Sequence, residues 1–156
     1  MTTPTRGAPA SFVIATWFGS GLLPRAPGTW GSLAALPFAW AIASIFGPIT
    51  LLYAAVLLFF VGWAASARIV AASGIQDPQM IVVDEVVGQW LTLAFVPPEG
   101  LPYLIGFLAF RAVDILKPFP AGWADRRVKG GLGVMLDDAL SAIYSAIITT
   151  ALVRLM

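Results

Sequence analysis

The residues of this sequence best suited to chemistry are carboxylates that interrupt apolar runs. Asp84 and Glu85 are adjacent within "MIVVDEVVGQWLTLAF", a stretch that is otherwise hydrophobic enough to enter a membrane. An ionised acid at bilayer depth is costly, and it is usually kept only where it faces a protein interior or a wet cavity. We therefore interpret the pair as functional. The alternative is that both acids simply begin a helix, where the helix dipole favours negative charge.

A second charged pattern occurs in "FRAVDILKPFP", where Arg111, Asp114 and Lys117 recur at every third residue. This spacing places the three side chains along one side of a helix, which Pro118 then ends. Such a stripe suits a phosphate group that lies next to a metal ion. It also suits a ladder of salt bridges at the membrane edge, and both interpretations stay open at this point.

The third pattern, "DRRVKGGLGVMLDD", has basic residues before a glycine-rich turn and two acids that open the last helix. Backbone N–H groups of Gly130 and Gly131 could cradle an anion there, and Arg126 could bind phosphate oxygens in bidentate fashion. Asp137 and Asp138 are candidate ligands of a cation. Either acid is also an ordinary candidate for a helix N-cap.

A fourth stretch, "LLPRAPGTWGS", places small and polar residues immediately before an apolar helix. Thr29 and the neighbouring backbone amides could therefore meet an anionic head group at the helix N-terminus. A simple turn in which Thr29 or Ser32 caps the helix is the alternative.

Composition identifies the class of protein and excludes much chemistry. The 156 residues are 59% hydrophobic and 11% charged, with a mean hydropathy of +0.87, whereas soluble domains carry roughly 25% charged residues. The sequence therefore predicts a membrane protein, with nothing that suggests nucleic-acid binding. Cysteine and histidine are both absent, which excludes disulfides, thiolate nucleophiles, imidazole bases and zinc sites built on either residue.

Five apolar segments predict an all-α, polytopic helix bundle. They cover residues 28–46, 48–67, 81–96, 101–116 and 139–153, and only the second approaches the roughly 20 residues of a simple spanning helix. We expect about four or five membrane helices, and a short interfacial or re-entrant helix over residues 11–23. Residues 1–156 form one predicted domain, and the N-terminal segment has no pattern typical of a cleaved signal peptide.

The charged residues fall on one side of this predicted bundle. The turns at Gly47 and at "VPPEG" contain neither lysine nor arginine, so the positive-inside rule places them outside the cytoplasm. Glu99 and Arg154 are the only charged residues that this arrangement predicts on the same, non-cytoplasmic side as the two turns. All other charged residues lie near the cytoplasmic face: Arg6, Arg25, Arg68, Asp77, Asp84, Glu85, Arg111, Asp114, Lys117, Asp125, Arg126, Arg127, Lys129, Asp137 and Asp138.

Several carboxylates and guanidinium groups without histidine favour Mg²⁺-assisted phosphate chemistry, in which the metal neutralises charge and the cations stabilise the transition state. The signature sequences of the haloacid-dehalogenase phosphatases and of the CDP-alcohol transferases are missing. A small membrane cation transporter or channel is the alternative, because intramembrane acids could form an ion path. It gives the clustered arginines and lysines no role. A non-catalytic lipid-binding subunit would explain the basic residues but not the excess of acids.

The four motifs together resemble the phosphatidylglycerophosphatase A family. They are "GSGLLPRAPGTWGSLAALP", "DPQMIVVDEVVGQW", "FRAVDILKPFP" and "DRRVKGGLGVMLDD". The resemblance implies a Mg²⁺-dependent phosphatase of bacterial inner membranes that converts phosphatidylglycerophosphate to phosphatidylglycerol. "DDALSA" departs from the family pattern, because Leu140 and Ser141 stand where the family more often has Ala-Gly.

The resemblance also implies a set of site residues on the cytoplasmic face. Asp84, Glu85, Asp114 and Asp138 are the expected catalytic residues, and with Asp137 they are the expected Mg²⁺ ligands. The expected phosphate-binding residues are Arg111, Lys117, Arg126, Thr29, Gly130 and Gly131, and Arg25, Arg127 and Lys129 rank below them. The nucleophile is either water or one carboxylate, and both remain possible, as do several oligomeric states and numbers of metal ions.

Overall fold

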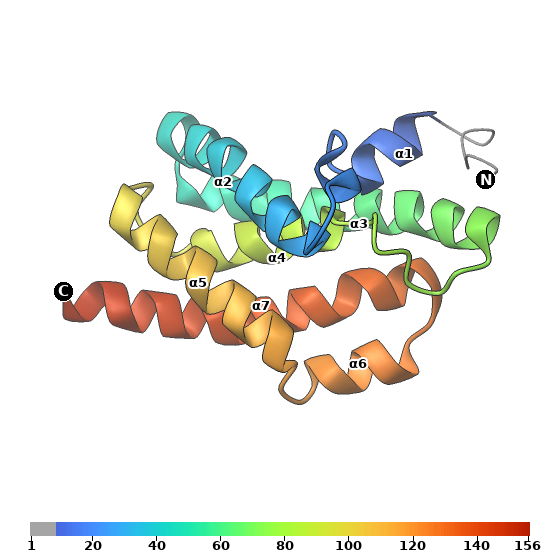
Figure 1. Cartoon of the computed structure of the whole chain (residues 1–156). Coiled ribbons are helices and arrows are strands. Elements are labelled where there is room, and N and C mark those ends of the chain that lie inside the picture. The colour runs from blue at the N-terminus through green and yellow to red at the C-terminus, as the bar shows by residue number, and fades with distance from the viewer. Residues whose placement is uncertain (1–8) are drawn as a thin grey trace.

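The computed structural model describes residues 9–156, and all regular structure in that range is helical (Figure 1). Arg6 lies outside the described residues. The elements in chain order are α1 (Pro9–Ala15), the short 3₁₀ helix η1 (Ser20–Leu22), α2 (Pro27–Phe46), α3 (Pro48–Ser73), α4 (Val83–Leu93), α5 (Gly100–Leu116), α6 (Ala121–Arg127) and α7 (Gly130–Leu155). The predicted all-α helix bundle is confirmed.

Three of these helices are long and apolar enough to cross a membrane, namely α2, α3 and α7. The most apolar window, in α3, has a mean hydropathy of 2.0. Helix α5 has 17 residues and α4 only 11. At 1.5 Å per residue, α4 is about 16 Å long, roughly half the hydrocarbon thickness of a bilayer. Residues 81–96 therefore form a short inner helix and not a simple span.

Proline and glycine set the bounds of the two N-terminal spanning helices. Pro27 and Pro48 occupy the first turns of α2 and α3, where a missing N–H costs nothing. Gly47 separates the two helices with φ +91°, a conformation that residues with a Cβ rarely adopt. The chain thus reverses direction between α2 and α3 through a single residue.

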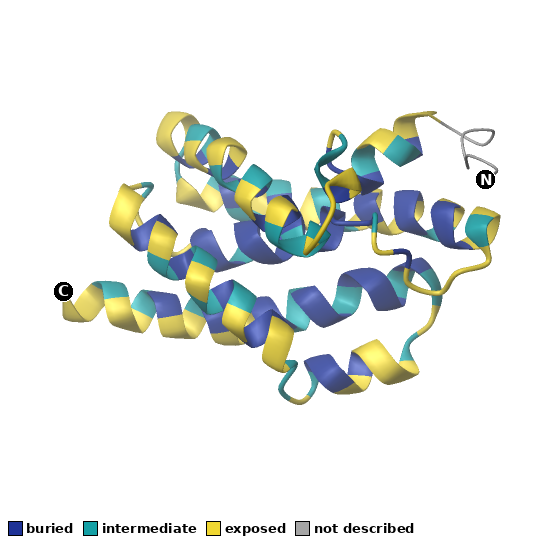
Figure 2. Cartoon of the chain, in the orientation of Figure 1, coloured by how far each residue is buried: buried dark blue, intermediate teal, exposed yellow. Residues whose placement is uncertain are grey.

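Helix α4 lies at the centre of the bundle. Nine of its 11 residues are buried, and it packs against α2, α3, α5 and α7. Figure 2 shows α4 as an almost continuous buried segment, whereas α3 and the C-terminal part of α7 expose apolar side chains. Those exposed faces, which include Leu57, Phe60 and Ile147, are the surfaces available to lipid.

Helices α4 and α7 run in the same direction. At one end, a Cβ at Gly88 would lie 3.2 Å from the carbonyl oxygen of Asp138. At the other end, a Cβ at Gly106 of α5 would contact both Leu93 and Thr149. Residues that follow Glu85 on α4 therefore lie level with residues that follow Asp138 on α7.

Two local predictions differ from the structure. The glycine-rich stretch after Lys129 is the first turn of α7 and not a loop, so Asp137 and Asp138 lie about two turns inside the helix and do not cap it. A Cβ at Gly131 would collide with the backbone of Ala67 on α3, so close helix packing outweighs the poor helix propensity of glycine. Residues 11–23 are divided between α1 and η1, because Trp17 and Phe18 adopt positive φ values.

The two ends of the bundle differ in what they carry. The α2–α3 turn, the α4–α5 turn and the C-terminus lie toward one end, at the left in Figure 1. Helix α6 and the connection between α3 and α4 lie toward the other end. This distribution matches the predicted separation of the turns without lysine or arginine from the charged motifs.

Candidate active site

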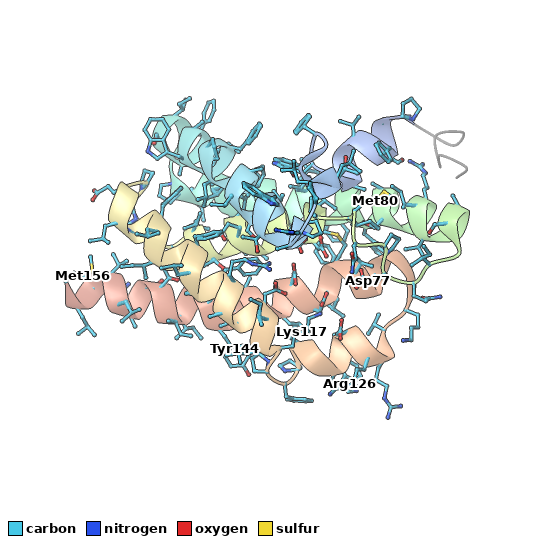
Figure 3. The ribbon with its side chains drawn as sticks, in the orientation of Figure 1. Asp77, Met80, Lys117, Arg126, Tyr144 and Met156 are labelled. Atoms are coloured by element: carbon cyan, nitrogen blue, oxygen red, sulfur yellow. The ribbon has the colours of Figure 1, made fainter. Side chains whose placement is uncertain are left out.

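A polar cavity of about 780 Å³ opens between the N-terminal ends of α2, α4 and α7 and the connections around them. It is lined by backbone and side chains from four separate stretches of the chain, including the loop after η1 and the loop before α4. Figure 3 shows Asp77 and Lys117 near the middle of the molecule, whereas Arg126 lies at its lower edge. The charged lining residues are Arg25, Asp77, Asp84, Glu85, Asp114, Lys117, Asp125, Lys129, Asp137 and Asp138.

Three of these carboxylates form the acid triad, which consists of Asp84, Glu85 and Asp138. Each can offer one oxygen such that all three oxygens lie within 4.8 Å of one another. Asp84 and Asp138 are only 9% and 3% exposed. Carboxylate oxygens with no hydrogen-bond partner occur on all three residues. Closely spaced, unpartnered oxygens of this kind fit a hard divalent cation such as Mg²⁺.

Local structure explains how Asp84 and Glu85 are held in an apolar core. Helix α4 begins at Val83, so both acids stand in its first turn, where free N–H groups favour negative charge. Asp84 and Glu85 can therefore both begin helix α4 and belong to the candidate site. The alternative drawn from the sequence, that these acids only begin a helix, describes their location but not their approach to Asp138.

The N-terminus of α2 closes against the triad. A Cβ at Gly28 would collide with the carboxylate of Glu85 and would lie 3.3 Å from a guanidinium nitrogen of Arg111. Any larger residue at position 28 would force the Glu85 carboxylate to move. Helix α2 thus brings its first backbone amides close to the acids, and Thr29, in the same turn, does not line the cavity.

Arg111 and Asp114 form an ion pair on α5, with 2.6 Å between Arg111 Nη1 and Asp114 Oδ2. This pair corresponds to the salt-bridge alternative that the three-residue spacing left open. Asp114 lines the cavity and Arg111 stands behind it. The guanidinium group therefore supplies positive charge next to both Asp114 and Glu85.

Lys117 leaves the stripe because it ends α5 in a left-handed conformation with φ +45°. Its Nζ donates hydrogen bonds to Asp125 Oδ1 at 2.7 Å and to Asp137 Oδ2 at 2.6 Å. Burial alone would lower the pKa of Lys117, but the two carboxylates outweigh it and raise the pKa above its usual value. The ammonium group therefore stays charged in any ordinary assay.

The structure gathers most of the predicted site residues and leaves a few apart. Those that line the cavity are Asp84, Glu85, Asp114, Asp137, Asp138, Lys117 and Gly130. Gly131 packs on α3, and Arg126 is exposed outside the cavity lining. Arg25 and Lys129, which ranked lower in the sequence, do line the cavity.

Two acids at the cavity were not among the predicted site residues. Asp77 comes from the loop before α4, and Asp125 comes from α6, where it binds Lys117. Their only signal in the sequence was membership of the motifs "DPQMIVVDE" and "DRRVKGG". With them, the cavity lining carries seven acidic and three basic side chains. Such an excess of negative charge would repel a phosphate ester unless a cation is also bound.

Comparison with known proteins decides among the classes of membrane protein considered from the sequence. The family model described as Phosphatidylglycerophosphatase A matches residues 13–153. The chain belongs to the phosphatidylglycerophosphatase A family. It is therefore a phosphatase, and the cation transporter interpretation has no support.

Curated relatives agree with this membership. A Haemophilus influenzae protein named phosphatidylglycerophosphatase A is 39% identical over 141 residues, covering 90% of this chain and 86% of the relative. An Escherichia coli protein of the same name is 40% identical over 136 residues, covering 86% of this chain and 78% of the relative. A Bacteroides thetaiotaomicron protein, provisionally named a phosphatidylinositol-3-phosphatase, is 40% identical over 144 residues, covering 87% and 89%. No solved structure matches the chain at a significant level.

Proposed function

We propose that this member of the family hydrolyses the terminal phosphomonoester of phosphatidylglycerophosphate in a Mg²⁺-dependent reaction. The products would be phosphatidylglycerol and inorganic phosphate. The observation that carries the proposal is the acid triad, whose oxygens lie within 4.8 Å of one another on the wall of a large polar cavity. The names of two curated relatives support the choice of lipid.

Asp84, Glu85 and Asp138 would hold the metal ion, with Asp114 and Asp137 beside them. When bound, Mg²⁺ would offset the negative charge of the acidic wall and polarise the phosphoryl group. Lys117 would contact phosphate oxygens while it keeps Asp137 in place. Arg25 and Lys129, both exposed at the cavity, would attract the anionic head group from the membrane surface.

The reaction itself exchanges one P–O bond for another. In the net reaction the bond from phosphorus to the glycerol oxygen breaks, and a water oxygen ends bonded to phosphorus, whether water attacks directly or through a carboxylate. One proton of that water ends on the departing glycerol oxygen, so that the lipid leaves as an alcohol, and the other stays with the phosphate product. The positive charge of Lys117 and of Arg111, which neighbours Glu85 and Asp114, favours the negative charge that spreads over the phosphoryl oxygens.

The test of this function is phosphate release by the detergent-solubilised full chain. We expect turnover of phosphatidylglycerophosphate with Mg²⁺, no turnover in excess EDTA, and recovery when Mg²⁺ is restored. Phosphatidylinositol 3-phosphate and phosphatidic acid serve as comparison substrates, because one relative is named for the former. Full turnover in EDTA would defeat the metal requirement, and a preference for either comparison lipid would defeat the proposed substrate.

We place the site on the cytoplasmic side of a bacterial inner membrane, because the basic residues gather at the cavity end of the bundle. The chain has no cysteine, so single cysteines can report sidedness without background. Cysteines introduced at Gly47 and Pro98 should react with an impermeant thiol reagent in intact cells. A cysteine at Arg127 should react only after lysis. The reverse pattern would invert the proposed orientation.

A further inference from the structure

Two buried polar side chains behind the acid triad have no partner in the described protein. Gln89 is completely buried, and both its amide nitrogen and its amide oxygen lack a hydrogen bond. Ser141 is 1% exposed, and its Oγ also lacks a hydrogen bond. Each unsatisfied buried polar group costs about 1–3 kcal/mol. Neither residue lines the cavity, so the proposed mechanism does not account for them.

Their positions connect both residues to the triad. Gln89 lies one turn after Glu85 on α4, and Ser141 lies one turn after Asp138 on α7. The two helices run in the same direction with Gly88 against Asp138, so Gln89 and Ser141 stand at similar depth. Long side chains in helices turn back toward the N-terminus, which directs the Gln89 amide toward the turn of Glu85.

The triad has unmet hydrogen-bonding capacity as well. Glu85 Oε2 and Asp138 Oδ2, which are among the unpartnered oxygens of the triad, are both buried, and each has two lone pairs, so that it can accept a hydrogen bond beside a cation. Together with the Gln89 amide N–H and the Ser141 hydroxyl, they provide two acceptors and two donors. One water molecule can donate two hydrogen bonds and accept two, and buried waters typically make two to four. These four groups fill the capacity of a single water, and the Gln89 amide oxygen is a further acceptor beyond it.

Other buried hydroxyls nearby are satisfied without help. Thr92 Oγ1 donates to the carbonyl oxygen of Gly88 at 2.8 Å, and Ser145 Oγ donates to that of Ser141 at 3.0 Å. Such bonds within one helix make a buried hydroxyl inexpensive. A glutamine amide has two donors and an acceptor to satisfy, and Gln89 has no such bond in the described structure.

We propose that Gln89 and Ser141 bind a buried water molecule behind the triad, and that this water orients the carboxylates of Glu85 and Asp138. Both would act as positioning residues for the cation that the proposed function assigns to the triad, and the inference rests on that function. The chemical class of the ligand is water, held between α4 and α7. Outer hydrogen bonds to metal-binding carboxylates commonly change metal affinity by about 10–100-fold.

The experiment measures Mn²⁺ binding to the solubilised full chain by electron paramagnetic resonance, which needs no turnover. Gln89→Met and Ser141→Ala should each raise the Mn²⁺ dissociation constant about tenfold. Because both residues hold the same water, the double variant should be no weaker than the weaker single variant. Thr149→Val is the matched control, since Thr149 is a buried, unpartnered hydroxyl on the same helix but far from the triad. Its dissociation constant should stay within about twofold of the parent.

Several results would overturn the inference. These are unchanged Mn²⁺ affinity in both single variants, a double variant with additive losses, or an equal loss in Thr149→Val. Thermal unfolding without metal gives a second criterion: Gln89→Met should lower the melting temperature if the amide is satisfied by water, and raise it if the amide is dry. Should Gln89→Met fail to fold, Ser141→Ala removes only one oxygen and decides alone. A parent protein that binds no Mn²⁺ would contradict the proposed function instead.

Discussion

The two halves of α7 bury different kinds of polar group. Near its start, Asp137 and Asp138 face the cavity, and each keeps a carboxylate oxygen that no donor reaches. Further along, the buried polar groups are hydroxyls: Ser145 donates to a carbonyl of its own helix, and Thr149 has no partner in the described structure. A hydroxyl can be satisfied locally, whereas a carboxylate has no proton to donate to its own helix. Within one helix, the kind of polar group thus separates the site from the scaffold.

The same comparison applies to what surrounds each half. Helix α7 packs against α3, α4, α5 and α6, and near its start Lys117, at the end of α5, supplies positive charge to Asp137. The second half exposes Ile143, Ile147 and Leu152 to the lipid side. Charge is therefore retained only where the bundle excludes lipid and admits a polar cavity. Three predictions test this division, from the largest expected effect to the smallest.

The largest effect is expected in the acid triad. Asp84→Asn and Asp138→Asn keep the shape of each side chain but remove its charge, so turnover should fall by about a thousandfold or more. The fold should persist, because neutral side chains suit the buried positions at least as well as acids. The measurement is phosphate release alongside a melting curve for each variant.

Glu99→Gln is the control for this prediction, because Glu99 is exposed at the opposite end of the bundle. Its turnover should match that of the parent protein. Well-folded Asp84→Asn and Asp138→Asn proteins with near-normal phosphate release would remove the distinction between the halves of α7.

An intermediate effect is expected at Lys117, one of the three basic side chains that line the cavity. Lys117→Ala removes an ammonium group that bonds Asp125 and Asp137. Hydrogen bonds to charged groups are worth about 1.5–3 kcal/mol, so kcat/KM should fall about 10- to 100-fold. Most of the change should appear in KM if Lys117 binds the phosphate before reaction.

Arg126→Ala provides the comparison, because Arg126 is exposed and lies outside the cavity lining. Its effect on kcat/KM should be smaller than that of Lys117→Ala. A larger loss from Arg126→Ala would show that Arg126 binds the phosphate more strongly than Lys117 does, which would favour the role that the sequence suggested for Arg126.

The smallest effect on activity is expected from the packing of α4 against α5 and α7 at Gly88. A Cβ at Gly88 would collide with the ring of Phe110 and approach the Asp138 carbonyl oxygen. Gly88→Ala should therefore lower stability by about 1–3 kcal/mol. Gly100→Ala is matched to it, since a Cβ there meets nothing within 4 Å, and it should leave the melting temperature nearly unchanged. Equal melting temperatures for the two variants would contradict the close contact of α4 with α5 and α7.

Much of this architecture could be predicted from residue types. Long apolar runs bounded by proline and glycine indicated α2 and α3, and acids within apolar runs indicated the cavity. The position of Asp137 and Asp138 within α7 could not be predicted, because Gly130, Gly131 and Gly133 weaken a helix in isolation. These glycines are helical because α7 packs closely against other segments, as Gly131 does against Ala67 of α3.

The directions of the side chains on α6 also could not be predicted from the sequence. Asp125 and Arg126 are neighbours, so a helix separates their directions by about 100°. Only one of two such neighbours can face the cavity, and the structure selects Asp125, which binds Lys117. The sequence shows which residues of this motif are charged. It does not show how the short helix α6 is rotated about its axis, and so it does not show which charged side chain faces the cavity. Arg25 and Lys129, which ranked lower in the sequence, reach the cavity from the loop after η1 and from the connection before α7.

The shortness of α4 has a consequence for how the protein is made. An 11-residue helix with two acids in its first turn is too short and too polar to enter a bilayer alone, since each acid adds several kcal/mol to the cost of insertion. Helix α4 can enter the membrane only when other helices pack around it and shield its acids from lipid. Its most extensive partner, α7, leaves the ribosome only after α5 and α6. Asp84 and Asp138 therefore meet late, and the nascent chain completes this candidate active site only when α7 docks.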